Sequence, residues 1–554
     1  MVTGFARQFT VATKCFCFAL TILLSAEAFS VEVEMPNEVD RGLLQPEVEH
    51  RLVVKFNDDL RARCVGGKVV CKDENATQYT AVLAAENNLQ FRPLLKIAEA
   101  KLGVLTKQAA VNSGRKQPDL CAMMVVEGAK EQLQQVALTL RGSKYVNWVE
   151  FERLTPPPSP GFDIAPLTPN YTLQGRQGYL GPNPGLNTLA FQAFDNSRGE
   201  GVKLADCEYW FHAEHEDLCD VIPEPGQTLH TSALTPQFNF DGTHGTSALG
   251  VSVGVDNSYG VCGISNKADA YFFPTWTNER GFDLATAIAN AVAAVGPGGI
   301  VLLEMQTSIL GGELYGPTEL INSIWNVVRV ASDSGVIVVA AAGNGDQDLD
   351  SSAYASYRAR GDSGAIIVGA GTPSTLHSRL DFSTFGSRVN VQGWGRSVFT
   401  LGDGDFSQVG GSADRNQFYT STFGGTSSAS AMLAGVCAAL QSYAVAKIGR
   451  PLTPAEMREV LTETGHPQSS GGNIGPFPDM VEAADYIISS FEPEFLLGDV
   501  NRDESVNFLD IGPFIGLLAS SNYRIEADIN FDGQVSFLDI APFINLLSQG
   551  GGTN

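Results

Sequence analysis

Residues 335–344 read GVIVVAAAGN, a run of β-branched and small apolar residues that ends in a glycine and a polar side chain. Three similar runs lie in the same part of the chain: GVKLADCEY at 201–209, GGIVLLEMQ at 298–306 and GAIIVGAG at 364–371. Apolar runs without polar alternation are typical of strands that are buried on both faces. We therefore expect these segments to be strands of one buried sheet.

Helix-like segments lie between these runs. DLATAIANAVAAV at 283–295 and TELINSIWNVVRVASDSG at 318–335 repeat apolar residues at helical spacing. Strands that alternate with helices predict a parallel sheet covered by helices on both faces. The fold class expected for residues 200–445 is therefore α/β, and reactive side chains are expected at the carboxyl ends of its strands.

Length and charge indicate several domains. The chain has 554 residues, of which 44% are hydrophobic and 18% are charged, as in an ordinary globular protein. At roughly 150 residues per domain, this length predicts about three domains. The net charge of −25 argues against a nucleic-acid partner, which would require a basic surface. Residues 29–155 hold 17 acidic and 17 basic residues, so the acidic excess begins after residue 155 and indicates a boundary there.

The N-terminus has the features of a secretion signal. Arg7 and Lys14 precede an apolar run at 15–24, and Ala26 and Ala28 form a small-x-small cleavage pattern. The run is shorter than the roughly 20 residues that cross a bilayer, and we expect no membrane span in the mature chain. Residues 1–28 are therefore predicted to be a signal peptide, and the mature protein is predicted to be secreted or extracellular.

Secretion permits disulfide bonds, and seven cysteines follow the predicted leader. Cys64 and Cys71 flank a Gly-Gly turn, and Cys207 and Cys219 bracket a loop, so both pairs are candidates for a disulfide. Spacing alone does not fix connectivity. Cys437, in the small-residue run GVCAAL, is expected to be a buried thiol.

Three segments carry side chains suited to acyl transfer. Asp206 ends a strand-like run, His244 lies in DGTHGTSALGVSVG at 241–254, and Ser427 lies in FGGTSSASAMLAGVCAAL at 423–440. Acyl transfer needs a hydroxyl, a base that takes its proton, and a carboxylate that orients the base. Each residue alone has an ordinary explanation as a cap or turn residue. Their order, each within its own motif on a parallel sheet, favours a catalytic set.

These motifs resemble those of the subtilisin-like serine proteases (peptidase S8 family). HGTSALGVSVG is similar to the family's His block, GGTSSASA to its Ser block, and HEDL at 215–218 to the segment after its aspartate. VIVVAAAGN resembles the segment whose asparagine helps to form the oxyanion hole. The resemblance implies a subtilisin-like fold and serine endopeptidase activity on protein or peptide substrates. It also implies the roles: Asp206 orients His244, His244 is the base, Ser427 is the nucleophile and Asn344 stabilises the oxyanion.

One residue limits what this resemblance implies. Glu304, in VLLEMQT, stands where the family usually has a small polar residue near the substrate cleft, so substrate specificity is not implied.

Residues 50–155 combine strand-like runs with the helix-like EGAKEQLQQVALTL at 127–140, and the proline-rich TPPPSPG follows at 155–161. This α+β segment resembles the family's prodomain, which implies a zymogen inhibited by its own propeptide and cleaved between Glu152 and Asn170. An independent binding domain is the alternative.

After residue 495 the chain contains a repeat with a period of 29, from Asp499 to Asp528. Calcium takes about six to eight oxygen ligands, which EF-type loops supply from positions 1, 3, 5, 7, 9 and 12. At these positions the first loop has Asp499, Asn501, Asp503, Ser505 (backbone), Asn507 and Asp510, and the second has Asp528, Asn530, Asp532, Gln534 (backbone), Ser536 and Asp539.

Aspartate at position 12 and the duplication resemble a type I dockerin. The resemblance implies a small all-α, Ca²⁺-binding tail and attachment to a cohesin-like or cell-surface partner. A tail that calcium folds but that docks to nothing is the alternative. Helical spacing predicts that Phe508, Phe514, Phe537 and Phe543 pack between the two helices rather than face a partner.

The sequence thus predicts a signal peptide at 1–28, a propeptide at 29–155, a catalytic domain at 156–490 and a dockerin-like domain at 495–549. The first hypothesis is a secreted, calcium-stabilised endopeptidase that is made as a zymogen. The second is a non-catalytic secreted surface or scaffold protein that keeps the protease fold as a binding module. The presence of all four expected catalytic side chains favours the first.

Overall fold

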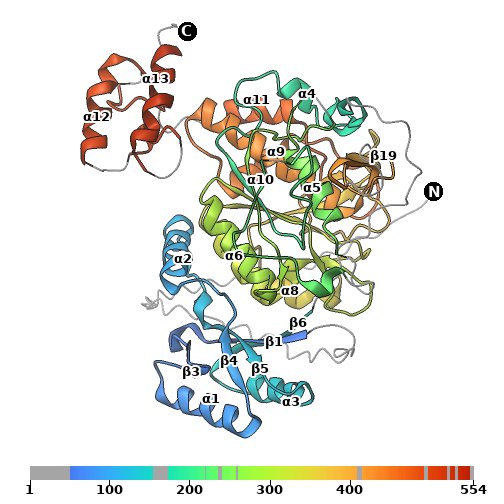
Figure 1. Cartoon of the computed structure of the whole chain (residues 1–554), viewed down its shortest axis with the longest axis vertical. Helices are drawn as coiled ribbons and strands as arrows, with labels where there is room; N and C mark the ends of the chain where they lie inside the picture. Colours follow the sequence, from blue (N-terminus) through green and yellow to red (C-terminus); the bar gives the residue numbers. More distant parts are fainter. Residues whose placement is uncertain are drawn as a thin grey trace, which may run out of the picture. The chain divides into compact units, whose positions relative to one another are not determined.

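The computed structural model (Figure 1) describes residues 50–153, 173–218, 220–234, 240–257, 260–408, 415–491, 497–503, 505–520, 524–530 and 534–549. The predicted leader, the processing segment after residue 153, Cys219 and Asp532 lie outside the described residues.

A seven-stranded sheet forms the centre of the catalytic part. Its strands are β7 (Lys203–Asp206), β8 (Ile222–Pro223), β9 (Asp269–Phe272), β12 (Ile300–Leu303), β15 (Ile337–Ala341), β16 (Ile366–Gly371) and β17 (Val391–Trp394), in the order β17-β16-β15-β12-β7-β9-β8. All neighbouring strands in it are parallel. The α/β class and the parallel sheet that the four apolar runs predicted are confirmed.

Helices cover the sheet on both faces, and β12 shows how. Ile300 and Leu302 pack in one core cluster with α5 (Thr243–Val253) and α9 (Gly425–Ile448). Val301 and Leu303 pack in a second cluster, with the helices α6 (Leu284–Val295) and α7 (Asn322–Asp333). Because successive strand side chains point to opposite faces, a strand buried between two helix layers is apolar at every position.

Helix α9 is the only helix in the described part of the chain that is long and apolar enough to cross a membrane. From the sequence, no segment of this length and hydropathy is expected after the leader. In its most apolar stretch, 89% of the residues are buried inside the protein. Its small residues let it pack closely against α5 and the sheet, as the core helix of the domain.

The rest of the catalytic part consists of short elements. The helices are α4 (Thr188–Phe191), α8 (Ala355–Ala359), α10 (Pro454–Glu463) and α11 (Met480–Ser490). The strands are β10 (Trp276–Thr277), β11 (Gly281–Phe282), β13 (Gln306–Thr307), β14 (Gly316–Pro317), β18 (Val398–Leu401), β19 (Ser407–Gln408) and β20 (Phe418–Phe423).

The N-terminal module is α+β, as predicted. An antiparallel sheet in the order β4-β5-β1-β6 contains β1 (His50–Phe56), β4 (Gln90–Pro93), β5 (Met123–Glu127) and β6 (Val146–Arg153). Its helices are α1 (Glu74–Asn87), α2 (Glu99–Ser113) and α3 (Lys130–Arg141), and β2 (Arg63–Val65) and β3 (Lys68–Val70) form a hairpin. Leu52, Val54 and Phe56, alternate residues of β1, are fully buried in the core of this module.

The predicted disulfide between Cys64 and Cys71 is wrong. The hairpin pairs Cys64 with Val69, so Cys71 lies beyond the paired residues and does not face Cys64. Instead, the Cys64 thiol lies 3.0 Å from the carbonyl oxygen of Phe91. Cys207 is a free thiol, and its candidate partner Cys219 lies outside the described residues. Cys437 is a buried free thiol, as expected.

The C-terminal tail is a small all-helical unit. It contains α12 (Ile511–Ser520) and α13 (Ile540–Gln549), each preceded by a 3₁₀ turn, at Phe508–Asp510 and Phe537–Asp539. Phe514 and Phe543 stack with their ring centroids 4.2 Å apart in its core. For these two the core prediction is confirmed. For Phe508 and Phe537 it is wrong, because they lie in the 3₁₀ turns and are 79% and 83% exposed.

Candidate active site

The end of β7 brings two carboxylates to the sheet edge, and the second one contacts His244. Oε2 of Glu208 lies 2.7 Å from Nδ1 of His244, and the other Glu208 oxygen accepts the N–H of Tyr209. Asp206 is fully buried, and neither of its carboxylate oxygens has a hydrogen-bond partner. The structure thus places Glu208, not the predicted Asp206, against the imidazole.

The reason lies in the reach of the two side chains. Residues two apart in an extended chain point to the same side, and Leu204 of β7 packs in the cluster that contains α5 and α9. Asp206 and Glu208 are the next two residues of that series. Glu208 lies beyond the last strand residue and has one more methylene, so it reaches α5. This same-side spacing was the available signal for Glu208, and sequence reasoning missed it.

Gly245 permits the close approach of Glu208 to α5. A Cβ atom at this position would lie 2.4 Å from the carbonyl oxygen of Trp210 and 3.0 Å from Cγ of Glu208. Any larger residue would push the carboxylate away from the first turn of the helix. That turn carries His244, which is only 8% exposed, and the imidazole packs edge-on against Phe423 with centroids 5.6 Å apart.

Glu304 adds a third carboxyl group to the site. It follows β12, which pairs with β7 so that Leu302 lies opposite Asp206. Oε2 of Glu304 lies 3.5 Å from Nδ1 of His244, and Glu304 is fully buried without a hydrogen-bond partner. Burial raises the pKa of both Asp206 and Glu304 well above the ordinary range, and the charge of Glu208 raises both further. Glu304 therefore lies beside His244 in the site.

A metal ion does not fit between these groups. One ligand atom each from Glu208, His244 and Glu304 lies within 4.8 Å of the others, a spacing that metal sites also show. However, the 2.7 Å between Nδ1 and Oε2 is a hydrogen-bond length. Two ligands bound to one ion at about 2.0–2.2 Å in tetrahedral geometry would lie farther apart than that. Glu208 and His244 therefore form a hydrogen-bonded pair and not two ligands of one ion.

Ser427 lies in the first turn of α9. The N–H groups of Gly425 and Thr426 in this turn already donate, to the carbonyl oxygen of Gly395 and to Oδ1 of Asn344. The hydroxyl group of Ser427 and Nε2 of His244 are both buried without a hydrogen-bond partner. Such groups are candidates to become partners of a substrate or of each other during a reaction.

Asn344 follows β15 and contacts the start of α9. Its side-chain oxygen accepts the N–H of Thr426 at 2.8 Å and the Thr426 hydroxyl at 2.9 Å. A Cβ atom at Gly425 would lie 2.9 Å from Nδ2 of Asn344, so a glycine is needed there. Because the oxygen is held in this way, the amide N–H₂ remains to donate to another group. The structure therefore brings Asn344 and the N-terminus of the Ser427 helix together.

The two loops of the tail have the same internal hydrogen bonds. The buried Asp510 accepts the N–H groups of Asn501 and Asn507, both at 2.9 Å. Its counterpart Asp539 accepts the N–H groups of the equivalent residues in the second loop, Asn530 at 3.0 Å and Ser536 at 2.8 Å. In each loop, the carboxylate at position 12 therefore holds two backbone N–H groups of the same loop. Among the described loop residues the oxygen donors fit calcium, which prefers hard oxygen ligands.

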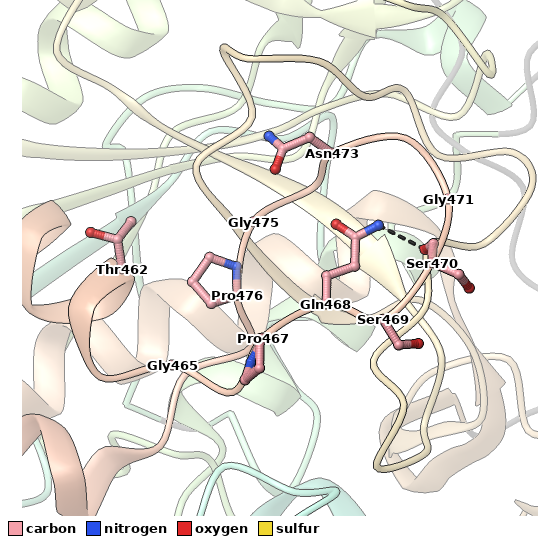
Figure 2. A pocket seen from close by; sticks show the side chains of 10 residues that line it. All are labelled: Thr462, Gly465, Pro467, Gln468, Ser469, Ser470, Gly471, Asn473, Gly475 and Pro476. Carbon is pink, nitrogen blue, oxygen red and sulfur yellow. Dashed lines mark hydrogen bonds between the residues drawn. The ribbon is translucent and has the colours of Figure 1, made fainter. Parts of the chain in front are cut away.

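A surface hollow beside the loop between α10 and α11 is not part of this chemistry. Figure 2 shows the loop between α10 and α11 that lines it, a space of about 510 Å³. Gln468 braces this loop through the carbonyl oxygens of Ser470 and Gly472, at 2.8 and 2.9 Å. The lining consists of glycines, prolines and uncharged polar residues, so it offers no acid, base or nucleophilic thiol.

A serine at a helix N-terminus, a histidine paired with a carboxylate and an amide donor, all on one parallel sheet, define a serine-hydrolase type of site. Comparison with known proteins gives the family. The subtilase family model matches residues 206–479, and the type I dockerin model matches residues 497–548. The chain belongs to the subtilase family and is a serine peptidase with a C-terminal type I dockerin domain.

Two relatives illustrate the similarity. Subtilisin DY of Bacillus licheniformis is 30% identical over 246 residues, which cover 44% of this chain and 78% of that protein. An intracellular serine protease of Paenibacillus polymyxa is 24% identical over 269 residues, 48% of this chain and 74% of that protein. Among solved structures, fervidolysin from Fervidobacterium pennivorans shares the fold, with a TM-score of 0.51 at 16% identity over 82% of this chain and 63% of that chain.

The contact with His244 makes a prediction that separates Glu208 from Asp206. We expect Glu208→Gln to lower kcat/KM by roughly 1,000- to 10,000-fold, because loss of the orienting carboxylate leaves the imidazole in the wrong tautomer. The matched variant Asp206→Asn should lower it by less than about 10-fold, since Asp206 has no contact with His244. Initial rates on a denatured protein substrate measure both. A larger loss for Asp206→Asn would return the orienting role to Asp206.

Proposed function

We propose that the protein is a secreted endopeptidase, made as a zymogen, that cleaves peptide bonds through an acyl-enzyme on Ser427. The observation that carries this proposal is the 2.7 Å contact between Glu208 and His244. Nδ1–H donates to Glu208, so Nε2 carries a lone pair and is free to take the proton of the Ser427 hydroxyl. The triad is then Glu208–His244–Ser427, with glutamate in place of the expected aspartate.

In the acylation step Oγ of Ser427 bonds to the substrate carbonyl carbon while its proton passes to His244. The carbonyl oxygen becomes an oxyanion, which accepts hydrogen bonds from the Asn344 amide and from the Ser427 backbone N–H. His244 then gives its proton to the leaving amine as the C–N bond breaks. Water repeats these steps on the acyl-enzyme and restores the serine.

Covalent labelling distinguishes this proposal from the alternative, a scaffold protein that keeps the protease fold without activity. We expect a fluorophosphonate to label the processed wild-type protein on Ser427, because the reagent requires a serine activated by its base. His244→Ala should abolish the label. Peptide mass spectrometry locates the modified residue, and a correctly folded, processed wild type that takes up no label would favour the scaffold protein.

Contacts of the N-terminal module support its role as a propeptide. Glu150 of β6 accepts the N–H groups of Asn322 and Ser323, at 2.9 and 3.0 Å, at the start of α7. Arg51 pairs with Asp283, the residue that caps α6. A carboxylate at a helix N-terminus satisfies free N–H groups and stabilises the helix. The module therefore holds the starts of two catalytic-domain helices, as a segment that assists folding would.

The zymogen proposal is tested by removing the nucleophile. In a protease-deficient host, Ser427→Ala should accumulate as an unprocessed precursor, while the wild-type chain is cut between Glu152 and Asn170. N-terminal sequencing and intact mass of the secreted protein measure this. Normal processing of the Ser427→Ala chain would show that another protease removes the segment.

For the tail we propose calcium binding in both loops and attachment to a cohesin-type or cell-surface partner. Type I dockerin domains bind calcium. The pairs Phe508–Leu509 and Phe537–Leu538 repeat at equivalent positions, and each of these side chains is at least 69% exposed. Exposed large apolar groups in matching places support a partner-binding role.

Calcium removal tests the metal proposal. Because ligand binding and folding are coupled in such loops, excess chelator should remove the helical signal of α12 and α13 and make the tail sensitive to added protease. Asp510→Ala should weaken calcium binding at least ~10-fold, since that carboxylate organises the first loop. Difference circular dichroism and calorimetry of the full chain give these values. A tail that stays helical and protease-resistant in chelator would exclude the proposal.

A further inference from the structure

The active-site cluster holds two acids that the proposed mechanism does not use. We propose that Glu304 and Asp206 keep their protons at neutral pH, and that Glu304 acts as a neutral hydrogen-bond donor to the Glu208–His244 pair. Glu304 is then a positioning residue, and the imidazole faces one buried negative charge instead of three. This inference rests on the proposed function, because it assigns a state to the acids beside the proposed base.

The arrangement of the strands forces the acids together. Strands β7 and β12 are adjacent and parallel, with Leu302 opposite Asp206, so their carboxyl ends meet at one edge. Oε2 of Glu304 and Oε2 of Glu208 approach the same Nδ1 atom, at 3.5 and 2.7 Å. An imidazole Nδ1–H can make one good hydrogen bond, and Glu208 accepts it. Glu304 must therefore be stabilised in another way.

Hydrogen bonding supports shared protons. Both carboxylate oxygens of Asp206 and both of Glu304 are buried and receive no N–H or O–H from any described group. Two ionised carboxylates only accept hydrogen bonds, so they cannot satisfy each other, whereas a protonated carboxyl group donates one. Buried polar groups are almost always paired. Protons held within the cluster provide the missing donors without any further residue.

The surrounding charges point the same way. The charges of Asp206 and Glu208 raise the pKa of Glu304, and the charge of Glu208 raises the pKa of Asp206, so these neighbouring charges are all negative. The neighbouring Cys207 thiol also lies in this buried segment, and Arg280 acts on it, but Arg280 pairs with Glu224 and acts on neither acid. Buried acids without a cation become neutral, because desolvation strongly disfavours their charged form.

Neutral acids have a consequence for catalysis. Three ionised carboxylates would strongly favour the imidazolium form of His244, which cannot take the serine proton. A protonated Glu304 removes one of these charges and, by donating to Glu208, draws electron density away from the carboxylate that orients the base. The imidazole of His244 then faces fewer negative charges that would hold it in the imidazolium form.

Glu304→Gln tests this assignment, because a glutamine amide is also neutral and also donates a hydrogen bond. We expect the acidic limb of the kcat/KM profile to move by less than about 0.3 pH unit, whatever the change in its plateau. If Glu304 were ionised, removing a negative charge 3.5 Å from the imidazole would move that limb down by about one unit or more. Such a shift would overturn the proposal.

Infrared spectroscopy gives a readout of the protons themselves. The difference spectrum between wild type and Glu304→Gln at pH 7 should contain the carbonyl stretch of a protonated carboxylic acid, and so should that for Asp206→Asn. Carboxylate bands in place of that stretch would overturn the proposal. Two separate variants keep the test valid where one of them fails to fold.

A third measurement is independent of enzyme activity. In full-length Ser427→Ala protein with ¹⁵N-labelled histidine, the midpoint of the His244 titration should be the same with and without the additional substitution Glu304→Gln. A midpoint lowered by about one unit in the double variant would contradict a neutral Glu304. An inactive wild type with unchanged midpoints would count against the proposed function alone and leave the proton assignment supported.

Discussion

The hydrogen bond between Glu208 and His244 is the constraint on which the site depends. It requires β7 to end beside the first turn of α5, and it requires Gly245 so that the glutamate can approach that turn. The parallel register of β7 with β12 then places Glu304 at the same imidazole. The close packing of α5 on α9 connects this pair to the helix that begins near Ser427.

The class of fold could be predicted from the sequence because burial has a direct signature. Strands covered on both faces must be apolar throughout, as Ile300–Leu303 and Ile337–Ala341 are, and such runs are visible without a structure. The order of His244, Asn344 and Ser427 along the chain was also informative. Each lies in a motif rich in glycine or small residues, where the backbone must approach another group closely.

The identity of the orienting acid could not be predicted in the same way. Asp206 is the last residue of β7 and Glu208 lies just beyond it, and a sequence does not show how far each of these side chains reaches. The prediction for Phe508 and Phe537 failed for another reason. Each exposed phenylalanine lies six residues before a buried one, a spacing that does not return to the same helix face, and it lies in a 3₁₀ turn before the helix begins.

The buried aspartates of the two domains show how hydrogen-bond donors decide the role of an acid. Asp510 and Asp539 each receive two backbone N–H groups, which orient their oxygens in the way that a cation ligand requires. Asp206 is equally buried but receives none. Donors favour the charged form of an acid, which a metal ion requires, whereas burial without donors favours the neutral form. Under the two proposals, the same residue type would bind calcium in the tail and limit the negative charge beside His244.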